Sequence, residues 1–556
     1  MSLDIAKHSN KLLFVPFGGA AEIGMNLNAY HYNGKWIIVD MGIGFADGHY
    51  PGVDIVLPLP DFLEEYKDDV EALLVTHAHE DHIGAVPYIW SAIGCPIYTT
   101  GFNKILLESK LSEFKHDENV EIIDVVANDK ITLSEFAFEF IPITHSIPDM
   151  HGIMIYSGGG NIFHTGDWKI DPNPVVGEVT DKEALERVSA EGVLALVGDS
   201  TNIFNEGESG SEGDLSKNLA NIISSEKENL VIVTTFSSNI ARIHSIAKAA
   251  ADNNRKVVLV GRSLWRLYNA AKQYGYMDGI DEFLPADSFN KFDRKEVLVI
   301  CSGCQGEELA ATSKIVQSAH QYISVAKGDM IIFSSKVIPG NERRIFDLFN
   351  KFHKLGVKVV HEQNNFVHVS GHPARNEIKE LYSIIKPKIV IPVHGEAMHL
   401  YEHCNFAKSI GIPHTVEVTN GNVIHISDDG ASVIGTLPSG YLAFDGNSII
   451  DISSNILRDR RSMMKDGIAV VILIFNRKQR LIRQPKILLP GVIDKREDVE
   501  LLDLIVEEVS DFLSSDKVSK NEDKVRTGVI KLVKKLLQTH RNKYPHIIVH
   551  SERISV

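Results

Sequence analysis

The sequence has few cysteines, no long apolar run and no excess of basic charge. Four cysteines in 556 residues are too few for a disulfide framework and are typical of a reducing cytoplasm. No uninterrupted apolar run reaches the roughly 18 residues that a membrane span needs, so we expect no contact with a membrane. The first ten residues lack the apolar segment of a secretory signal, and we therefore predict a cytoplasmic protein.

The balance of charge is acidic, with 57 basic and 73 acidic side chains and a net charge of −16. This balance excludes a protein that binds nucleic acid through its overall charge alone. A local basic cleft or bound cations can still accept a nucleic acid. Two of the cysteines, Cys301 and Cys304, form a single C-x-x-C motif. A zinc ribbon needs a second such pair, so we interpret both as packed thiols.

The densest chemical motif is the nonapeptide Thr-His-Ala-His-Glu-Asp-His-Ile-Gly at residues 76–84. It follows an apolar segment, residues 72–75, that is typical of a buried strand. Imidazole and carboxylate groups are ligands for zinc and related divalent metals. One four-coordinate ion cannot easily take all the ligands of so short a turn, so the spacing indicates two adjacent ions, a hydrolytic arrangement. The alternative, a histidine-rich surface turn, is disfavoured by the ordered spacing after an apolar strand.

Five other apolar segments also end at a residue that can bind a metal. These residues are Asp40, His145, Asp167, Asp199 and His394. One or two such endings would be unremarkable. Because sites in layered α/β folds gather where loops at strand ends converge, six endings indicate one shared site.

The pattern of strands and helices predicts four segments. Residues 1–205 alternate short strands with glycine-rich turns, whereas residues 206–368 alternate helices with parallel-type strands, as in a doubly wound α/β domain. Residues 369–450 return to the first domain, and residues 451–556 form a third α/β unit. The insert therefore divides the metal-binding domain in the sequence. We expect the active site between the metal-binding domain and the insert.

These motifs resemble the metallo-β-lactamase superfamily and, within it, the β-CASP nucleases of the ribonuclease J type. The H-x-H-x-D-H pattern is matched by His77, His79, Asp81 and His82. The three β-CASP motifs are matched by Asp199, His368 and His394, and a histidine at the last position goes with RNA substrates. Supporting segments are residues 18–26, 51–54, 198–202 and 304–307. The resemblance covers essentially the whole chain and implies an αββα sandwich with an inserted doubly wound domain and a small α/β C-terminal domain.

The resemblance implies two zinc ions per subunit, with manganese as an alternative. One ion would be held by His77, His79 and His145, the other by Asp81, His82 and His394, and Asp167 would lie between them. Asp40 would orient a ligand histidine. A hydroxide activated by both metals would attack the phosphodiester, with Asp81 among the catalytic residues. His368, paired with Asp199, would protonate the leaving 3′ oxygen.

Exonucleases of this family also recognise a 5′-monophosphate. Backbone amides and small hydroxyls before a helix suit a phosphate. We expect this pocket to contain Ser238 and Asn239 from one segment and Ser370, Gly371 and His372 from another, with help from Arg242. The two serines can instead be plain helix caps. We interpret His164 as structural, because strand alternation directs it away from the face of Asp167, and His399 and His403 as structural, because no acidic pattern accompanies them.

The resemblance thus implies an enzyme that removes nucleotides from 5′-monophosphorylated RNA and also cuts single-stranded RNA internally. It would act in RNA maturation and decay and leave 5′-phosphate products. It would also form a homodimer or homotetramer and associate with partners in RNA decay. A small-molecule hydrolase is one alternative, which the large insert disfavours. A silent scaffold subunit is another, which the complete set of ligand positions disfavours.

Overall fold

The computed structural model describes residues 3–46, 48–114, 120–478, 480–494, 496–515 and 521–554. The chain divides into two compact units, Met1–Gly44 with Leu57–Gly440 and Phe45–Val56 with Tyr441–Val556. The short segment Phe45–Val56 thus belongs with the C-terminal unit, although almost four hundred residues separate the two in the sequence. No helix among the described residues combines the length and the apolar character of a membrane span.

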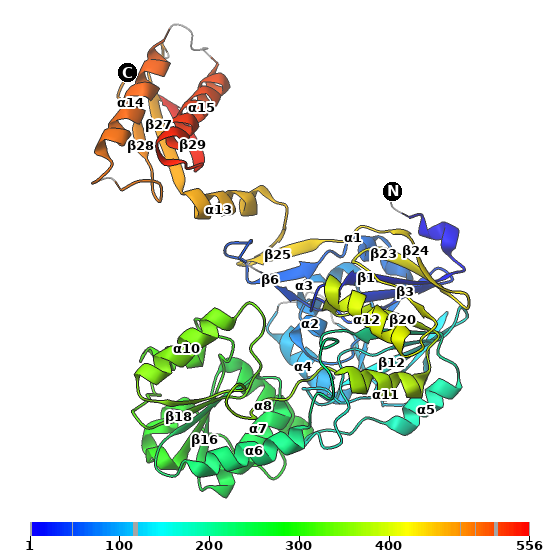
Figure 1. The fold of residues 1–556 in the computed structure, drawn as a ribbon. Coiled ribbons are helices and arrows are strands. Elements are labelled where there is room, and N and C mark those ends of the chain that lie inside the picture. Colours follow the sequence, from blue (N-terminus) through cyan, green and yellow to red (C-terminus); the bar gives the residue numbers. More distant parts are fainter. Residues whose placement is uncertain are drawn as a thin grey trace. The chain divides into compact units, whose positions relative to one another are not determined.

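The first unit contains two sheets packed face to face (Figure 1). The eight-stranded sheet has the order β24-β23-β1-β3-β4-β7-β8-β9. Its strands are β1 (Leu12–Gly18), β3 (Leu27–Tyr32), β4 (Lys35–Val39), β7 (Val70–Leu74), β8 (Ile97–Thr99), β9 (Ile122–Asp124), β23 (Asn422–Ser427) and β24 (Gly430–Thr436). Strands β4, β7, β8 and β9 are parallel, so their carboxyl ends share one edge.

The seven-stranded sheet has the order β10-β11-β12-β13-β14-β20-β22. Its strands are β10 (Ile131–Thr132), β11 (Phe136–Pro142), β12 (His151–Ser157), β13 (Ile162–His164), β14 (Ala195–Asp199), β20 (Ile389–Val393) and β22 (His414–Thr415). The last four are parallel, and β20 comes from the part of the chain that follows the insert. The two halves of the first domain are therefore joined in one sheet.

Alternating side chains of each strand build the core of this sandwich. In β14, Val197 packs between the sheets with Phe14 and Val39, whereas Leu196 faces the outer helices. This alternation is the two-residue period of a strand. Each large apolar side chain that is fully buried stabilises the fold by about 1.5–3 kcal/mol. The helices that accompany the sheets are α1 (Asp61–Glu65), α3 (Val86–Ile93), α5 (Lys182–Ala190), α11 (Arg375–Ile385) and α12 (Ala397–Ser409).

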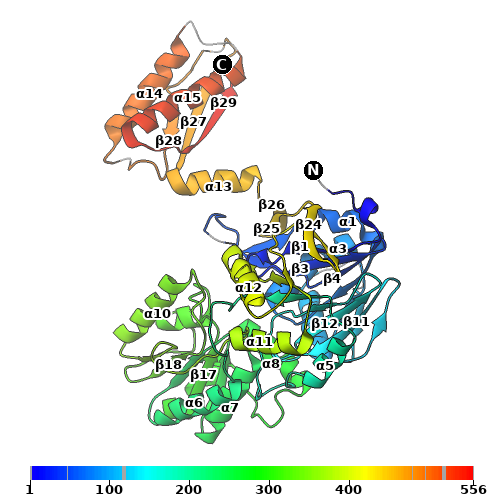
Figure 2. The same ribbon diagram turned by 45° about the vertical axis from the view of Figure 1, so that its right-hand side comes forward.

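The insert is a five-stranded parallel sheet in the order β16-β17-β15-β18-β19. Its strands are β15 (Val231–Thr234), β16 (Lys256–Val260), β17 (Val297–Cys301), β18 (Met330–Phe333) and β19 (Lys358–Val360). Helices α6 (Glu212–Ser225), α7 (Ile240–Asp252) and α8 (Arg262–Tyr274) cover one face, and α9 (Ala311–Val316) and α10 (Glu342–Lys354) cover the other (Figure 2). Helix α8 also packs against α4 (Gly101–Ser112) of the sandwich, which joins the two domains.

The C-terminal unit contains two small sheets. One has the order β26-β25-β6-β5, and its strands are β5 (Gly44–Phe45), β6 (Ile55–Pro58), β25 (Tyr441–Asp445) and β26 (Ser448–Asp451). Helix α13 (Asn455–Asp466) leads to the other, which consists of β27 (Ile468–Phe475), β28 (Lys486–Leu488) and β29 (His546–Arg553). Helices α14 (Val499–Ser514) and α15 (Glu522–Arg541) bury one face of that sheet.

The predicted fold class is confirmed: a layered α/β sandwich carries a doubly wound insert and a small C-terminal α/β unit. The interpretation of the cysteines is also confirmed, because all four are free and buried. Cys301 lies 3.3 Å from the Thr312 hydroxyl. Burial raises the pKa of the Cys301 thiol to about 11, so this group is unreactive at neutral pH.

Candidate metal centre

The strand ends that the sequence singled out meet at one place. The nonapeptide follows β7, Asp40 follows β4, and the other residues lie at or after the ends of β11, β13, β14 and β20. Within the nonapeptide, residues Glu80–Ile83 form the single-turn helix α2. Residues 41–43 hold the backbone of this helix: the Met41 amide donates to the His82 carbonyl (2.7 Å), and the Ile43 amide donates to the Glu80 carbonyl (3.0 Å).

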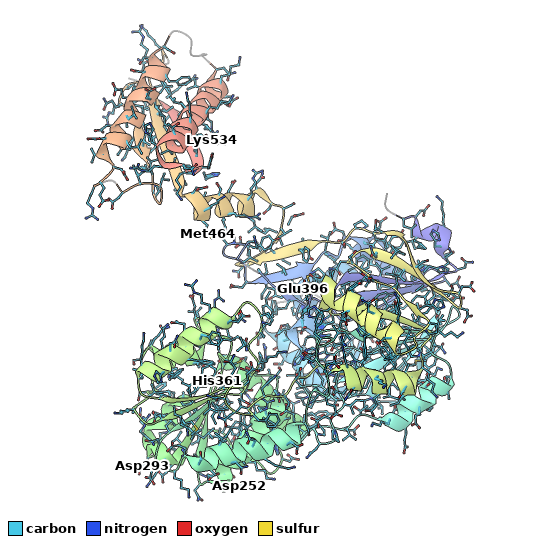
Figure 3. The ribbon with its side chains drawn as sticks, in the orientation of Figure 1. Asp252, Asp293, His361, Glu396, Met464 and Lys534 are labelled. Atoms are coloured by element: carbon cyan, nitrogen blue, oxygen red, sulfur yellow. The ribbon has the colours of Figure 1, made fainter. Side chains whose placement is uncertain are left out.

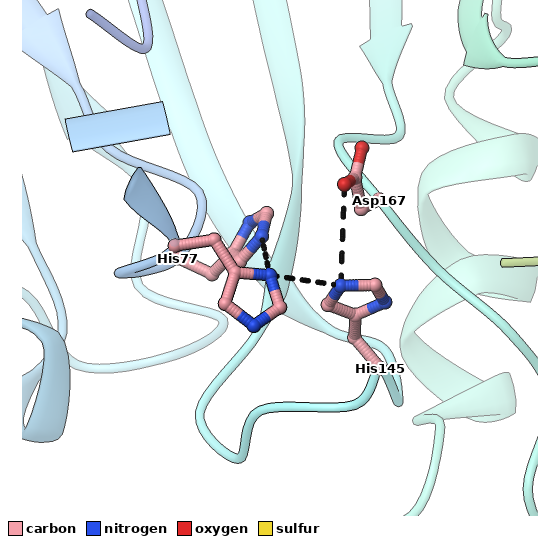
Figure 4. A group of neighbouring side chains, drawn as sticks. His77, His145 and Asp167 are labelled. Carbon is pink, nitrogen blue, oxygen red and sulfur yellow. Dashed lines mark hydrogen bonds and ion pairs between the residues drawn. The ribbon is translucent and has the colours of Figure 1, made fainter. Parts of the chain in front are cut away.

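Three histidine nitrogens and one carboxylate form a first ligand group. Nδ1 of His79 lies 3.0 Å from Nε2 of His77 and 3.2 Å from Nε2 of His145 (Figure 4). Asp167 completes the group, with Oδ2 at 3.9 Å from Nε2 of His145. Tetrahedral ligands at the zinc–nitrogen distance of about 2.0–2.1 Å are themselves about 3.3–3.4 Å apart, so these separations fit one ion.

A second ligand group shares Asp167 with the first. Nε2 of His82 lies 3.2 Å from Asp167 Oδ2 and 3.7 Å from Asp81 Oδ2. His394 lies across from it, with Nδ1 at 3.1 Å from Asp167 Oδ1 and Nε2 at 3.3 Å from Asp81 Oδ2. Asp167 therefore lies between the two groups, and all seven residues predicted as ligands are brought together.

Unsatisfied polar atoms support the fit of cations to these groups. Both ring nitrogens of His394 are buried and make no hydrogen bond of good geometry with any described residue, although carboxylate oxygens of Asp167 and Asp81 lie 3.1 and 3.3 Å away. A buried polar atom without a partner costs roughly 1–3 kcal/mol, which a bound ion can offset. Burial, together with neighbouring histidines, holds the pKa of His77 and of His145 well below the usual range. Their rings are therefore neutral and offer lone pairs.

Surrounding groups fix which ring nitrogen faces the centre. Asp40 Oδ2 lies 2.7 Å from Nδ1 of His82, in agreement with the orienting role expected of this aspartate. The Thr76 hydroxyl donates to Asp40 and lies 3.0 Å from Nδ1 of His77. Nδ1 of His145 lies 2.6 Å from the Gly371 carbonyl, to which it donates. Each contact leaves Nε2 directed at the centre, as metal-binding histidines require. No sequence motif indicated the roles of Thr76 and the Gly371 carbonyl.

Charge is concentrated at the shared carboxylate. Burial alone would raise the pKa of Asp167, but His394 and His82 hold it well below its usual range. Burial would likewise lower the pKa of His82, but the carboxylates of Asp167, Asp81 and Asp40 raise it well above its usual value. Three carboxylates around a buried imidazole thus create a site that attracts positive charge.

The structure corrects one pairing. We expected Asp199 to pair with His368, but Oδ2 of Asp199 lies 2.8 Å from Nδ1 of His372. The reason is the path of the chain before His372: Gly371 packs so closely that a Cβ there would lie 2.8 Å from the His145 ring. Asn202 donates to the Ser370 hydroxyl (2.7 Å) and to the His372 carbonyl (2.9 Å). These contacts present the ring of His372, not that of His368, to Asp199.

His368 lies in a different environment. Its Nδ1 is buried and makes no hydrogen bond with any described residue. Burial, and then the cations Arg242, Lys336 and Lys169, hold the pKa of His368 well below its usual range. A neutral ring is a poor acid. Of the three cations, Arg242 is paired with Glu212 and Lys169 with Asp171 (2.8 Å), whereas Lys336 is exposed.

The segment at residues 238–242 differs in part from its predicted role. The Asn239 side chain accepts from the Arg242 amide (2.8 Å), so Asn239 and not Ser238 caps helix α7. Its amide nitrogen donates to Glu212 (3.1 Å). The guanidinium of Arg242 is 1 % exposed, forms two contacts with Glu212 (2.9 and 2.7 Å) and donates to the Val367 carbonyl (3.4 Å). Arg242 therefore braces the chain beside His368 and is too deeply buried to contact RNA directly.

The other histidines occupy structural positions. Nδ1 of His164 lies 2.7 Å from the Tyr30 hydroxyl in the core of the sandwich. His403 is held from both sides, by the hydroxyls of Ser200 (2.9 Å) and Tyr382 (2.6 Å). His399 packs its ring against Phe204 at 5.2 Å. None of the three belongs to a group of potential ligands among the described residues.

Comparison with known proteins gives matches along most of the chain. The beta-lactamase superfamily domain matches residues 35–185, and the ribonuclease J beta-CASP domain matches residues 228–352. The Zn-dependent metallo-hydrolase RNA specificity domain matches residues 356–416, and the ribonuclease J C-terminal domain matches residues 455–554. The last two segments contain His394 and the β27–β29 sheet, respectively.

Whole-chain similarity agrees with these matches. A ribonuclease J of Sinorhizobium meliloti is 39 % identical over 88 % of both chains. Ribonuclease J 1 of Streptococcus pyogenes is 35 % identical over 90 % of both chains, and ribonuclease J2 of Bacillus subtilis is 31 % identical over 89 % of this chain and 90 % of its own. A solved protein of unknown function from Enterococcus faecalis V583 shares the fold, with a TM-score of 0.52, 17 % identity and coverage of 75 % of this chain and 100 % of its own.

Proposed function

This chain belongs to the ribonuclease J family and is a metal-dependent ribonuclease, and we propose that it removes nucleotides from the 5′ end of 5′-monophosphorylated RNA and also cuts single-stranded RNA internally. The observation that carries the proposal is the pair of ligand groups joined by Asp167. A phosphodiester hydrolase with two adjacent ions has this arrangement.

The seven ligand residues are His77, His79, Asp81, His82, His145, Asp167 and His394. Two zinc ions, or manganese in their place, would supply an activated water and neutralise charge on the scissile phosphate. The protein's own part is to hold the ligands before the substrate arrives. Asp40, Thr76 and the Gly371 carbonyl fix three imidazoles, so little reorganisation is needed during the reaction.

The leaving oxygen takes its proton from His372 in this proposal. When water oxygen attacks phosphorus and the bond to the 3′ oxygen breaks, that oxygen needs a proton. Burial alone would lower the pKa of His372, but Asp199, Asp167 and Asp81 raise it to about 9. Asp167 and Asp81 would bind the metal ions, so Asp199 is the carboxylate that still favours a protonated ring when metal is bound, and it holds Nδ1 so that Nε2 is left to donate. The products would carry a 5′-phosphate and a 3′-hydroxyl.

The 5′-monophosphate would bind beside His368. Lys336 is the exposed cation beside His368, since Lys169 and Arg242 are buried and paired with Asp171 (2.8 Å) and Glu212 (2.7 Å), and the unpaired Nδ1 of His368 can take part in a hydrogen bond to an anion. The Ser370 hydroxyl and the backbone of residues 370–372 lie in the same loop, braced by Asn202. Ser238 precedes the cap of α7 and supplies the opposite side in this proposal, whereas Asn239 acts through that cap. A charged pocket for a terminal phosphate favours cutting from the 5′ end.

The ribonuclease proposal is tested by incubating the purified chain with 5′-monophosphorylated RNA and either zinc or manganese. We expect metal-dependent release of mononucleotides, and Asp81→Ala should abolish it. The buried histidine His403 provides a control, because it lies outside the ligand groups. Absence of cleavage with either metal, or an Asp81→Ala variant as active as the parent, would refute the proposal. Cleavage of a small thioester or lactam instead would favour the small-molecule alternative.

A further inference from the structure

The glycine-rich segment Gly18–Asn26 has no part in the chemistry described so far. It runs from the end of β1, through the short strand β2 (Ala20–Ala21), to the start of β3. Its backbone turns sharply, with φ of +84° at Gly19, +63° at Ala21 and +51° at Met25. A non-glycine residue at positive φ costs about 1–3 kcal/mol, so its surroundings must hold Met25 in this conformation. A conformation held at such a cost points to a function.

Asn26 clamps the carbonyl of a ligand residue. Its backbone amide donates to the Asp81 carbonyl at 2.9 Å, and its side-chain amide donates to the same oxygen at 3.1 Å. Helix α2 has only one turn, so this carbonyl lies among the terminal carbonyls that a helix leaves unpaired. The amide nitrogen of Asn26 also lies 3.1 Å from Nε2 of His82, the nitrogen that would bind the ion, so with metal bound this is a packing contact and the Asp81 carbonyl is the acceptor that Asn26 keeps. One buried asparagine, 3 % exposed, thus touches two ligand residues.

The start of the segment contacts His394, which belongs to the same ligand group as Asp81 and His82. The His394 amide donates to the Gly19 carbonyl at 2.6 Å. Strand β2 then pairs with β21 (Gly395–Glu396), the two residues that follow His394; Figure 3 labels Glu396. His394 itself has a φ of +52°, so the pairing fixes a backbone conformation that histidine rarely adopts.

Close packing keeps the segment in place. A Cβ on Gly18 would lie 2.0 Å from the Met25 carbonyl oxygen, and one on Gly19 would lie 2.4 Å from the Asn26 amide oxygen. The Glu22 carboxylate accepts from the Gly19 amide (3.1 Å) and from Asn420 (2.6 Å). The segment is therefore a rigid bracket between α2 and the strand that returns from the insert.

We propose that segment 18–26 is the positioning element of the second ligand group, with Asn26 as its principal positioning residue. The inference rests on the proposed two-metal function. The segment contacts Asp81, His82 and His394, whereas the first group is held by Thr76 and the Gly371 carbonyl. Thr76 and Asp40 together touch ligands of both groups, whereas the contacts of Asn26 with ligand residues fall in the second group, so the second ion depends on Asn26 more than the first does.

Metal binding to the full-length chain tests this assignment. Manganese or zinc is titrated into the metal-free protein by calorimetry, and bound metal is counted by elemental analysis. The parent should bind two ions. In Asn26→Ala and in Asn26→Leu, which keeps the volume but not the amide, the first ion should bind as in the parent, and the second about 10–100-fold more weakly. Asn103→Ala is the matched control, because Asn103 is fully buried and its amide also donates twice, to the Thr100 hydroxyl and the Asp149 carbonyl, neither of which belongs to a ligand residue.

The outcomes separate the inference from the proposed function. Parent-like binding of both ions in the two Asn26 variants would overturn the inference, and so would equal weakening of both ions. If Asn26→Ala unfolds without metal, Asn26→Leu and the melting temperature of its metal-free form decide whether binding or folding is affected. A parent chain that binds fewer than two ions, or binds two and leaves RNA uncut, would contradict the proposed function instead.

Discussion

The carboxylate of Asp199 lies 2.8 Å from Nδ1 of His372, and the same ring nitrogen is 3.9 Å from Asp167. Asp199 is itself fixed, because one of its oxygens accepts from the amide (2.8 Å) and the hydroxyl (2.7 Å) of Thr201. The pair therefore connects the motif at the end of β14 with the edge of the second ligand group. In the proposed reaction, a histidine held by a buried aspartate at this position would donate the proton that the leaving oxygen needs.

Replacement of His372 by alanine should lower kcat by about 10²–10⁴-fold on RNA, whatever its 5′ group, because the leaving oxygen loses its proton donor. A phosphodiester with a p-nitrophenolate leaving group needs no proton, so its hydrolysis should fall much less. Steady-state kinetics on both substrates checks this. Equal losses on the two substrates would argue against proton donation by His372.

Replacement of His368 should affect substrate selection and not the chemical step. In His368→Ala we expect the preference for 5′-monophosphate over 5′-hydroxyl RNA to fall, mainly through KM, while internal cleavage stays near the parent rate. The physical reason is that a neutral His368 lies beside three cations. A uniform fall of kcat on every RNA would restore His368 as the candidate acid.

The sequence indicated the ligands but not this division of roles. Each ligand lies at or just after the end of a strand, so a local pattern was enough to find it. His368 and His372 are four residues apart in one loop, and the pattern does not distinguish them. The choice depends on contacts with distant residues, through Asn202 and through the ring of His145 against Gly371.

Metal content should follow the geometry of the two groups. The parent should bind two ions per chain. His394→Ala should bind one, because the group of His77, His79, His145 and Asp167 does not include His394 and stays complete. Asp167→Ala should fall below one ion, because both groups share this carboxylate. His403→Ala should keep two, which provides the control. Elemental analysis after dialysis measures all four. If Asp167→Ala still binds two ions, Asp167 is not a ligand that both ions share.

The buried pair of Glu212 and Arg242 should dominate the stability of the domain junction. Glu212→Gln should lower the free energy of unfolding by about 3–5 kcal/mol, because Arg242 stays buried without a counter-charge. Asp214→Asn, in an exposed pair on the same helix, should change it by about 0–1 kcal/mol. Denaturant unfolding of the metal-free proteins compares them. If Glu212→Gln loses no more unfolding free energy than Asp214→Asn, the buried pair does not brace the chain.

The same pair gives a pH dependence with a definite sign. Burial raises the pKa of Glu212, but Arg242 outweighs it and lowers the pKa. The stabilisation is therefore present above the unfolded pKa of about 4.3 and is lost as pH falls through the lower folded value. The difference in unfolding free energy between the parent and Glu212→Gln should stay constant above about pH 5 and shrink in more acidic solution.

The architecture was more predictable than the contacts within it. The alternation of helical and apolar segments was enough to predict a doubly wound insert and a small α/β C-terminal unit. It could not show that Phe45–Val56 belongs with the C-terminal unit, because that grouping joins segments far apart in the sequence. The resemblance also implied that Arg242 assists the phosphate pocket, because the sequence does not reveal that Glu212 occupies its guanidinium.

The most direct test is product analysis on two RNAs that are labelled throughout and differ only in the 5′ group. With the monophosphate, we predict stepwise release of 5′-mononucleotides from the first cycle onward. With the 5′-hydroxyl, release should begin only after an internal cut. Equal rates of mononucleotide release from both RNAs, or release from the 3′ end, would contradict a 5′-to-3′ exonuclease with a phosphate pocket at His368.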